Sequence, residues 1–231
     1  MSKYNFKKDV IKTPFGTIKS EVSLFPLGYI LIVYLSGLLK WKIWEDKTIY
    51  QLWSNFEHLS EHFQFIFYLS ASFFSIVIIL KNQYKILSLQ NINWIIFFVF
   101  CFFISIEEVS YLNNMQGNFF DSIRSNNMQN EVNFHNSLFF HSFLHSGMII
   151  INIFFGWFGW RYLCFIDAIP KKIYSLYFLF TALAFTILRL KILFKSSFLL
   201  AIPLTDETFE FLMALGLFLH SLAMLRKYLR N

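Results

Sequence analysis

Apolar residues in this chain form long runs that are separated by short polar and charged segments. A helix that spans a membrane needs about 20 mostly apolar residues. Backbone N–H and C=O groups have no water to bind inside a bilayer, so runs of this kind are expected to be helical. The pattern therefore predicts an all-α fold, a polytopic transmembrane helix bundle of about six spans. The predicted spans are residues 22–39, 63–80, 90–106, 137–160, 173–190 and 204–225.

The composition excludes the main alternatives to a membrane protein. The 231 residues are 56% hydrophobic and only 15% charged, and 32 of them are Phe. A water-soluble domain needs more charge on its surface, and a disordered chain needs more polarity. The two cysteines, Cys101 and Cys164, lie in apolar runs. They are too few for a disulfide-rich fold or a Cys-based zinc site.

The basic residues predict the orientation in the membrane. The formal net charge is +6, but Lys and Arg occur in short clusters between the apolar runs. This distribution is typical of topology signals rather than of a surface that binds nucleic acid, so no nucleic-acid partner is expected. With the N-terminus inside, 13 of the 20 basic residues are cytoplasmic, and both termini are expected there. Segments 1–21, 81–89, 161–172 and 226–231 hold 5, 2, 3 and 3 of them.

The chain shows no internal repeat and no Pro- or Gly-rich linker, so we expect one domain. A basic cytoplasmic N-terminal segment at 1–21 precedes a single transmembrane bundle at 22–226. A polar outer-face segment at 107–136 belongs to the bundle, and 227–231 forms a short cytoplasmic tail.

Acidic residues and histidines gather on the non-cytoplasmic side, which holds 11 of the 14 Asp and Glu residues and five of the six histidines. Ionisable groups at membrane helices are costly and mark candidate functional sites. Glu107 and Glu108 end the third predicted span, where adjacent carboxylates repel each other. Either residue is a candidate catalytic base. The alternative is that both simply reach interfacial water.

A second group of polar residues leads into the fourth predicted span. If this segment is helical and continuous with the span, five polar residues share one face within an arc of roughly 120°. They are Glu131, His135, His141, His145 and Asn152. Side chains at i,i+4 spacing can share one ligand. The alternative is that the histidines only form hydrogen bonds with neighbouring helices.

Carboxylates also open the last predicted span. Glu207 suits the first turn of a helix, because its charge complements the helix dipole. The dipole explains Glu210 less well, because Glu210 lies one turn further into the span. Carboxylate and histidine ligands from several helices are typical of metal sites in bundles. The candidate metal ligands are Glu108, Glu131, His135, His141, His145, Glu207 and Glu210, with Gln129, Asn133 and Asn136 as supporting residues. The candidate cofactor is a divalent metal, namely zinc, manganese or iron.

Two motifs carry a family resemblance. Residues 107–111 read Glu-Glu-Val-Ser-Tyr, and residues 129–136 read Gln-x-Glu-x-Asn-x-His-Asn. This resembles a family of uncharacterised bacterial polytopic membrane proteins whose members read E-E-I-S-W-G-Q-R and then N-x-Q-x-E-x-N-x-H-N. The chain departs from the family at 111–114, where Tyr-Leu-Asn-Asn replaces W-G-Q-R and removes an expected arginine. The resemblance implies a multi-pass protein of the bacterial inner (cytoplasmic) membrane.

These residues favour an enzyme that works at the outer bilayer face. The expected activity is a metal-dependent hydrolase or transferase acting on a lipid or a membrane-embedded substrate. One alternative is a cation- or proton-coupled transporter. Another is a non-catalytic subunit of a membrane complex or homo-oligomer, with small residues such as Gly147 and Gly156 at the helix contacts.

Overall fold

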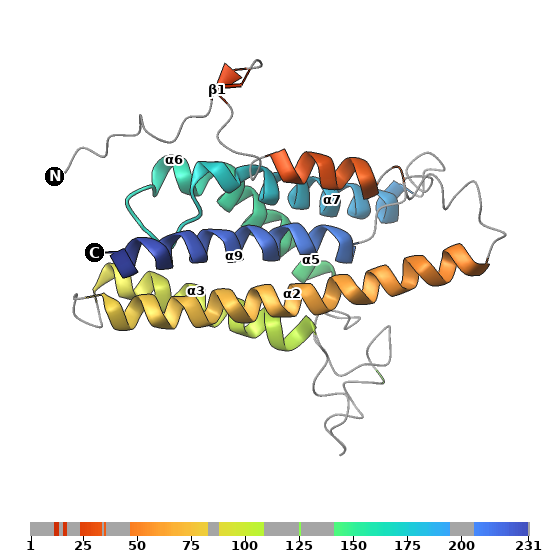
Figure 1. The fold of residues 1–231 in the computed structure, drawn as a ribbon. Helices are drawn as coiled ribbons and strands as arrows, with labels where there is room; N and C mark the ends of the chain where they lie inside the picture. The colour runs from red at the N-terminus through yellow and green to blue at the C-terminus, as the bar shows by residue number, and fades with distance from the viewer. Residues whose placement is uncertain are drawn as a thin grey trace.

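The computed structural model describes residues 12–13, 16–17, 24–33, 35, 47–82, 88–108, 125, 141–194 and 206–230. The described chain is almost entirely helical, which confirms the predicted all-α class (Figure 1). The exception is a pair of two-residue antiparallel strands, β1 (Lys12–Thr13) and β2 (Gly16–Thr17).

Four described helices are long and apolar enough to cross a membrane, so the chain is a multi-pass membrane protein. They confirm the spans predicted at 63–80, 90–106, 173–190 and 204–225. The helices are α2 (Lys47–Lys81), α3 (Leu89–Glu108), α7 (Ser175–Phe194) and α9 (Asp206–Arg230). A 3-10 helix, η3 (Lys172–Tyr174), leads into α7.

The other two predicted spans differ from these four. The first, 22–39, contains a short apolar helix, Leu24–Val33. The fourth, 137–160, contains a π-helical segment that interrupts its α-helical hydrogen-bond pattern. Its parts are α5 (His141–Ile153), the π-helix η2 (Phe154–Gly159) and α6 (Trp160–Tyr162), which follow one another without a break.

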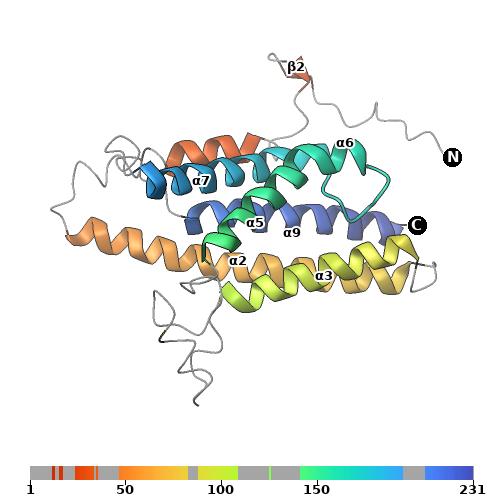
Figure 2. The ribbon, with the colours of Figure 1, turned by 180° about the vertical axis from the view of Figure 1, so that it is seen from behind.

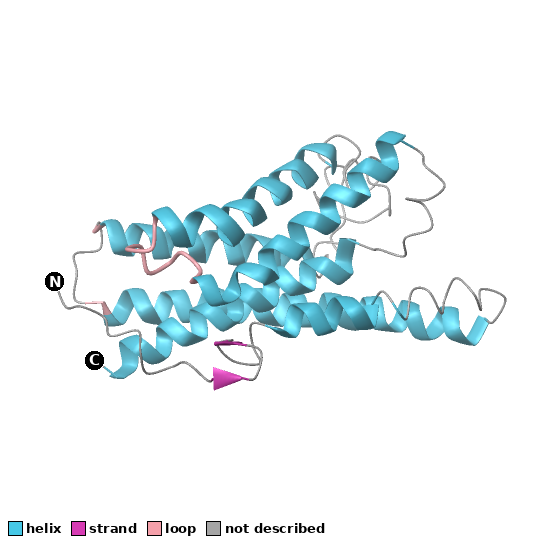
Figure 3. Ribbon diagram, turned by 90° about the horizontal axis from the view of Figure 1, so that it is seen from above, coloured by secondary structure: helices cyan, strands magenta, loops and turns pink. Residues whose placement is uncertain are grey.

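Helix α9 lies at the centre of the bundle. It packs against α2 on one side and against α7 on the other, while α3 lies along α2 and α5 packs obliquely against α7 (Figures 1 and 2). The short helix Leu24–Val33 covers α7 and α9. Its Tyr29 ring stacks on Phe211 of α9 at 5.2 Å, and its Phe25 ring lies 6.3 Å from Tyr177 of α7. Seen from above, α2 extends beyond its neighbours (Figure 3).

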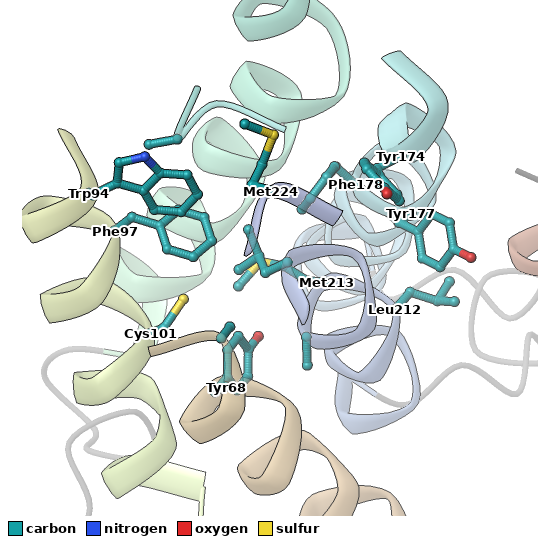
Figure 4. Close-up of a cluster of buried hydrophobic side chains, with 14 of the residues drawn as sticks. Tyr68, Trp94, Phe97, Cys101, Tyr174, Tyr177, Phe178, Leu212, Met213 and Met224 are labelled. Carbon is teal, nitrogen blue, oxygen red and sulfur yellow. The ribbon is translucent and has the colours of Figure 1, made fainter. Parts of the chain in front are cut away.

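The core lies around α9, where side chains of its neighbouring helices pack against it from both sides. Figure 4 shows side chains of α3 and α7 on either side of Met213 of α9. The outward faces of the bundle are also apolar. Phe73 of α2, Ile96 of α3 and Ile150 of α5 are each at least 60% exposed. A soluble protein rarely exposes so much apolar surface, whereas hydrocarbon chains solvate it well.

Candidate functional site

The bundle has two ends, and hydrogen bonds between helices define one of them. At the end of α2, the side-chain amide of Asn82 donates to Oδ1 of Asn91, near the start of α3 (2.8 Å). In η3, directly before α7, the hydroxyl of Tyr174 donates to the carbonyl oxygen of Leu219, in the second half of α9 (3.3 Å). We call this the Asp167 end, after the acidic residue in its loop.

The opposite end, which we call the Glu107 end, holds the last turn of α3 and the first turns of α5 and α9 (Figure 2). Helices α3 and α9 meet where the rings of Trp94 and His220 stack with centroids 6.1 Å apart. At about 1.5 Å per residue, Glu107 lies about 20 Å from this contact along α3, and Glu210 lies about 15 Å from it along α9. Two predicted carboxylates therefore reach the same end of the bundle at similar depth.

Of the two histidines of α5, the one whose side chain the structure describes is His145, and it lies at this end as well. The amide of Asn152 donates to Sδ of Met213 at 3.0 Å, which fixes the depth of α5 against α9. His145 lies about two helical turns before Asn152, towards the Glu107 end. Its ring meets Phe185 of α7 edge-on at 5.1 Å. His145 therefore faces the interior of the bundle, as a polar group in a membrane helix should.

The predicted site residues that the structure describes differ in how far they are buried. Glu107 is buried, with 9% of its surface exposed, whereas Glu210 and His145 are half-buried. For three others the structure describes the helical backbone but not the side chain: Glu108, His141 and Glu207. The remainder lie outside the described residues: Gln129, Glu131, Asn133, His135 and Asn136. Within the described part of the chain, no group of three His, Cys, Asp or Glu residues forms a metal-binding cluster.

The structure adds residues to the Glu107 end that the sequence analysis did not select. Arg189 of α7 donates a hydrogen bond to the hydroxyl of Ser146 on α5. This contact brings a positive charge to the residue that follows His145 in the chain. On α2, the fully buried amide of Gln64 donates to the hydroxyl of Ser60 (3.2 Å). The i,i+4 spacing of Ser60 and Gln64 in the sequence could have predicted this contact. Nothing in the sequence pairs Arg189 with Ser146.

At the Asp167 end, the loop between α6 and η3 joins neighbouring helices. Gln90 of α3 binds this loop through both atoms of its amide. Its Nε2 donates to the carbonyl oxygen of Phe165 (3.0 Å), and its Oε1 accepts from the backbone N–H of Asp167 (3.3 Å). One side chain thereby satisfies two backbone groups of the loop and fixes the loop against the start of α3.

Asp167 connects the same loop to α9. Its carboxylate accepts from Lys227 Nζ (2.7 Å) and from the hydroxyl of Tyr228 (3.0 Å), and Lys171 Nζ lies 3.6 Å from its other oxygen. Burial of the carboxyl favours its neutral form. The hydrogen bond and charge of Lys227, the charge of Lys171 and the Tyr228 hydrogen bond outweigh burial and lower the pKa of Asp167. The carboxylate is therefore charged at neutral pH.

His220 of α9 completes this end of the bundle. It is fully buried, and its Nε2 lies 3.0 Å from the backbone carbonyl oxygen of Asp167. Because a carbonyl oxygen only accepts, Nε2 carries the proton in this contact. Among the described residues, Nδ1 has no hydrogen-bond partner. The sequence shows an acidic residue and a histidine in otherwise apolar surroundings, but these residues are too far apart in the chain to be paired by spacing.

Comparisons with known proteins give no assignment. No family model, no curated protein and no solved structure matches the chain. The two ends of the bundle hold different polar groups. The Asp167 end is built from ion pairs and backbone contacts that join elements of the fold. The Glu107 end brings a buried carboxylate, a second carboxylate, an imidazole and a guanidinium to one membrane face.

Proposed function

We propose that this membrane protein is an enzyme with a carboxylate and histidine site at the Glu107 end. The site belongs to a metal-dependent hydrolase or transferase that acts on a lipid or a membrane-embedded substrate. The observation that carries the proposal is the burial of Glu107 at the same end as His145 and Glu210. A carboxylate is costly to bury in an apolar bundle unless a cation or hydrogen-bond donors compensate for the lost water.

The proposed chemistry assigns roles to residues of α3 and α9 and of the segment before α5. Glu107 or Glu108 acts as the general base or as a ligand, and Glu210 contributes from α9. The segment before α5 contributes Glu131 and His135, whose spacing also supports the proposed membership of the bacterial family with the Gln-x-Glu-x-Asn-x-His-Asn motif. A divalent metal held there would lower the pKa of a bound water molecule and supply the nucleophile of a hydrolysis.

The proposed topology has six spans with both termini in the cytoplasm of a bacterial cell. Described basic residues at the Asp167 end include Lys81, Arg161, Lys172, Lys227 and Arg230, whereas Lys47, Arg189 and Lys191 lie towards the other end. The positive-inside rule then places the Asp167 end in the cytoplasm. The helical stretch 141–162 has 22 residues and is about 33 Å long, which suffices for a fifth span. The helix Leu24–Val33 would belong to the remaining span, the first in chain order.

A transporter is the weaker proposal. A path for cations or protons requires polar groups that continue through the bundle. Asn152 is buried between the two ends, and His220 is buried near the Asp167 end. Asn152 donates to the carbonyl oxygen of Met148 and to Met213, and His220 binds the backbone of the 163–171 loop. These contacts support helix packing.

Metal content tests the proposed site directly. We expect purified wild-type protein to hold about one zinc, manganese or iron ion per chain by elemental analysis. Glu108→Gln and His135→Ala should each lower that content at least about tenfold, because each removes a ligand. His62→Ala is the matched control, since it removes an exposed imidazole from α2 and should leave the metal bound. Metal-free wild-type protein, or full metal content in both ligand variants, would show the proposal to be wrong.

A further inference from the structure

Two cations share one indole ring at the corner where α6 ends. The guanidinium carbon of Arg161 lies 3.6 Å from the ring centroid of Trp157 and 4.8 Å from that of Trp160. From the other side of the loop, Lys172 Nζ lies 5.1 Å from the Trp160 centroid. Each contact is within the range of a cation–π interaction. Two like charges are thereby held close together on one aromatic platform.

The platform is fixed by the π-helix before it. Trp160 Nε1 donates to the carbonyl oxygen of Gly156 (2.9 Å), which orients the indole. Gly159 allows the following loop to approach, because a Cβ there would lie 2.8 Å from Cγ2 of Ile169. π-Helical turns are frequent at functional sites. Here the turn, two glycines and one hydrogen bond set the position of the ring that both cations contact.

The charges of this corner are not neutralised within the described part of the chain. Asp167, the acidic residue of the same loop, pairs with Lys171 and Lys227 instead. Neither Arg161 nor Lys172 forms an ion pair or donates a hydrogen bond to a described residue. Stacking occupies only the face of a guanidinium, so the N–H donors at its edge stay available.

Exposed aromatic rings surround the two cations. Trp157, Phe158, Tyr162 and Phe165 are between 44% and 68% exposed. These rings lie at the Asp167 end of a bundle whose sides are apolar. Aromatic rings beside basic side chains are typical of the boundary between hydrocarbon and headgroups. The corner therefore presents positive charge to the headgroup layer and apolar rings to the acyl chains.

We propose that Arg161 and Lys172 form a binding site for the headgroup of an anionic phospholipid. The lipid phosphate accepts hydrogen bonds from the edge of the Arg161 guanidinium and from the Lys172 ammonium. The exposed rings of Phe158 and Tyr162 contact the glycerol and the first methylenes of the acyl chains. The charge of the site is complementary to this ligand, and its place at the membrane boundary selects a lipid over a soluble anion. This site is separate from the Glu107 end and independent of the chemistry proposed there.

Native mass spectrometry of the full chain in detergent tests the site, with dioleoylphosphatidylglycerol and dioleoylphosphatidylcholine as probes. We expect tighter binding of the anionic lipid. Removal of each cation should weaken it about fivefold, so Arg161→Gln with Lys172→Gln should weaken it roughly 25-fold. Binding of the zwitterionic lipid should change less than about twofold. Arg161→Lys keeps the charge and should retain most of the affinity.

Lys81→Gln and Arg230→Gln are the matched controls. Both residues are exposed cations at the same end, and neither contacts an indole within the described chain. Each control should keep wild-type affinity for the anionic lipid. The proposal fails if the double variant binds phosphatidylglycerol as the wild type does, or if the controls weaken binding equally, since the surface charge would then act diffusely. Displacement of the lipid by inorganic phosphate at equal concentration would identify a soluble anion as the ligand.

Discussion

At the residue scale, Asp167 shows how one carboxylate can join several elements of a membrane protein. Its side chain binds Lys227 and Tyr228 of α9, its backbone N–H binds Gln90 of α3, and its carbonyl oxygen accepts from His220. Four contacts from two helices therefore meet at one loop residue. Because only 17% of the surface of this side chain is exposed, its ion pairs are only partly screened by water.

Asp167→Asn should lower the free energy of unfolding by about 1–2 kcal/mol near pH 7, because Lys227 loses its charged partner. The folded-state pKa of Asp167 is lower than the unfolded value of about 3.9, so its stabilising contribution is present above that pH. The contribution is lost as the pH falls through the folded-state pKa. Thermal unfolding in detergent should therefore separate the variant from the wild type at pH 7, and the difference should shrink below about pH 4. A difference that is constant over this range would contradict the ion-pair assignment.

At the element scale, α9 is the helix around which the others are arranged. It is buried between α2 and α7, and its small residues allow that contact. Gly216 lies so close to α7 that a Cβ there would be 2.9 Å from Cβ of Tyr177 and 3.2 Å from Cζ of Phe178. Gly147 on α5 is different, because a Cβ there would meet nothing within 4 Å. Glycine is thus needed at one position for packing and not at the other.

Gly216→Ala and Gly147→Ala form a matched pair. The first should destabilise the protein by about 1–3 kcal/mol, because the added methyl group overpacks the α7–α9 contact. The second should leave stability unchanged or raise it by up to about 1 kcal/mol, because alanine favours a helix more than glycine does. Thermal unfolding of both variants in the same detergent gives the comparison. Equal stability of the two variants would mean that α7 and α9 do not approach each other at Gly216.

At the scale of the whole molecule, the polar groups divide between two ends. Basic side chains dominate the Asp167 end, while Glu107, His145 and Glu210 lie towards the other. The two cysteines report on this arrangement, because Cys164 is exposed in the loop at the Asp167 end and Cys101 is buried in α3. The protein thus carries a single natural thiol that can be labelled from one side of the membrane.

A membrane-impermeant maleimide should label Cys164 in inverted inner-membrane vesicles and should not label it in intact spheroplasts of a bacterial host. This result follows if the Asp167 end is cytoplasmic, as we propose from the positive-inside rule. Cys164→Ser should abolish the labelling, since Cys101 is buried. Labelling in spheroplasts but not in inverted vesicles would reverse the proposed orientation.

Several features of the fold were predictable from local sequence. Hydrocarbon forces each long apolar run to satisfy its own hydrogen bonds, so runs such as 63–80 and 90–106 had to be helices. The same argument did not reveal the π-helical turn at Phe154–Gly159, because that turn depends on packing: Cβ atoms at Gly156 and Gly159 would each lie 2.8 Å from a side chain outside the turn. Of the predicted polar stripe, the structure describes the side chains of His145 and Asn152, and both face the interior of the bundle.

By itself, the sequence determined that the chain is a multi-pass helical membrane protein and that its acidic and basic residues fall at different ends of the spans. These properties depend on hydropathy and on the order of residues along single helices. Only the tertiary structure decided that α9 is central, that Glu107 is buried, and that Gln90, Asp167 and His220 meet. Those contacts join residues 53 to 77 positions apart in the chain. No local pattern encodes such pairs, because they depend on which faces of the helices pack together.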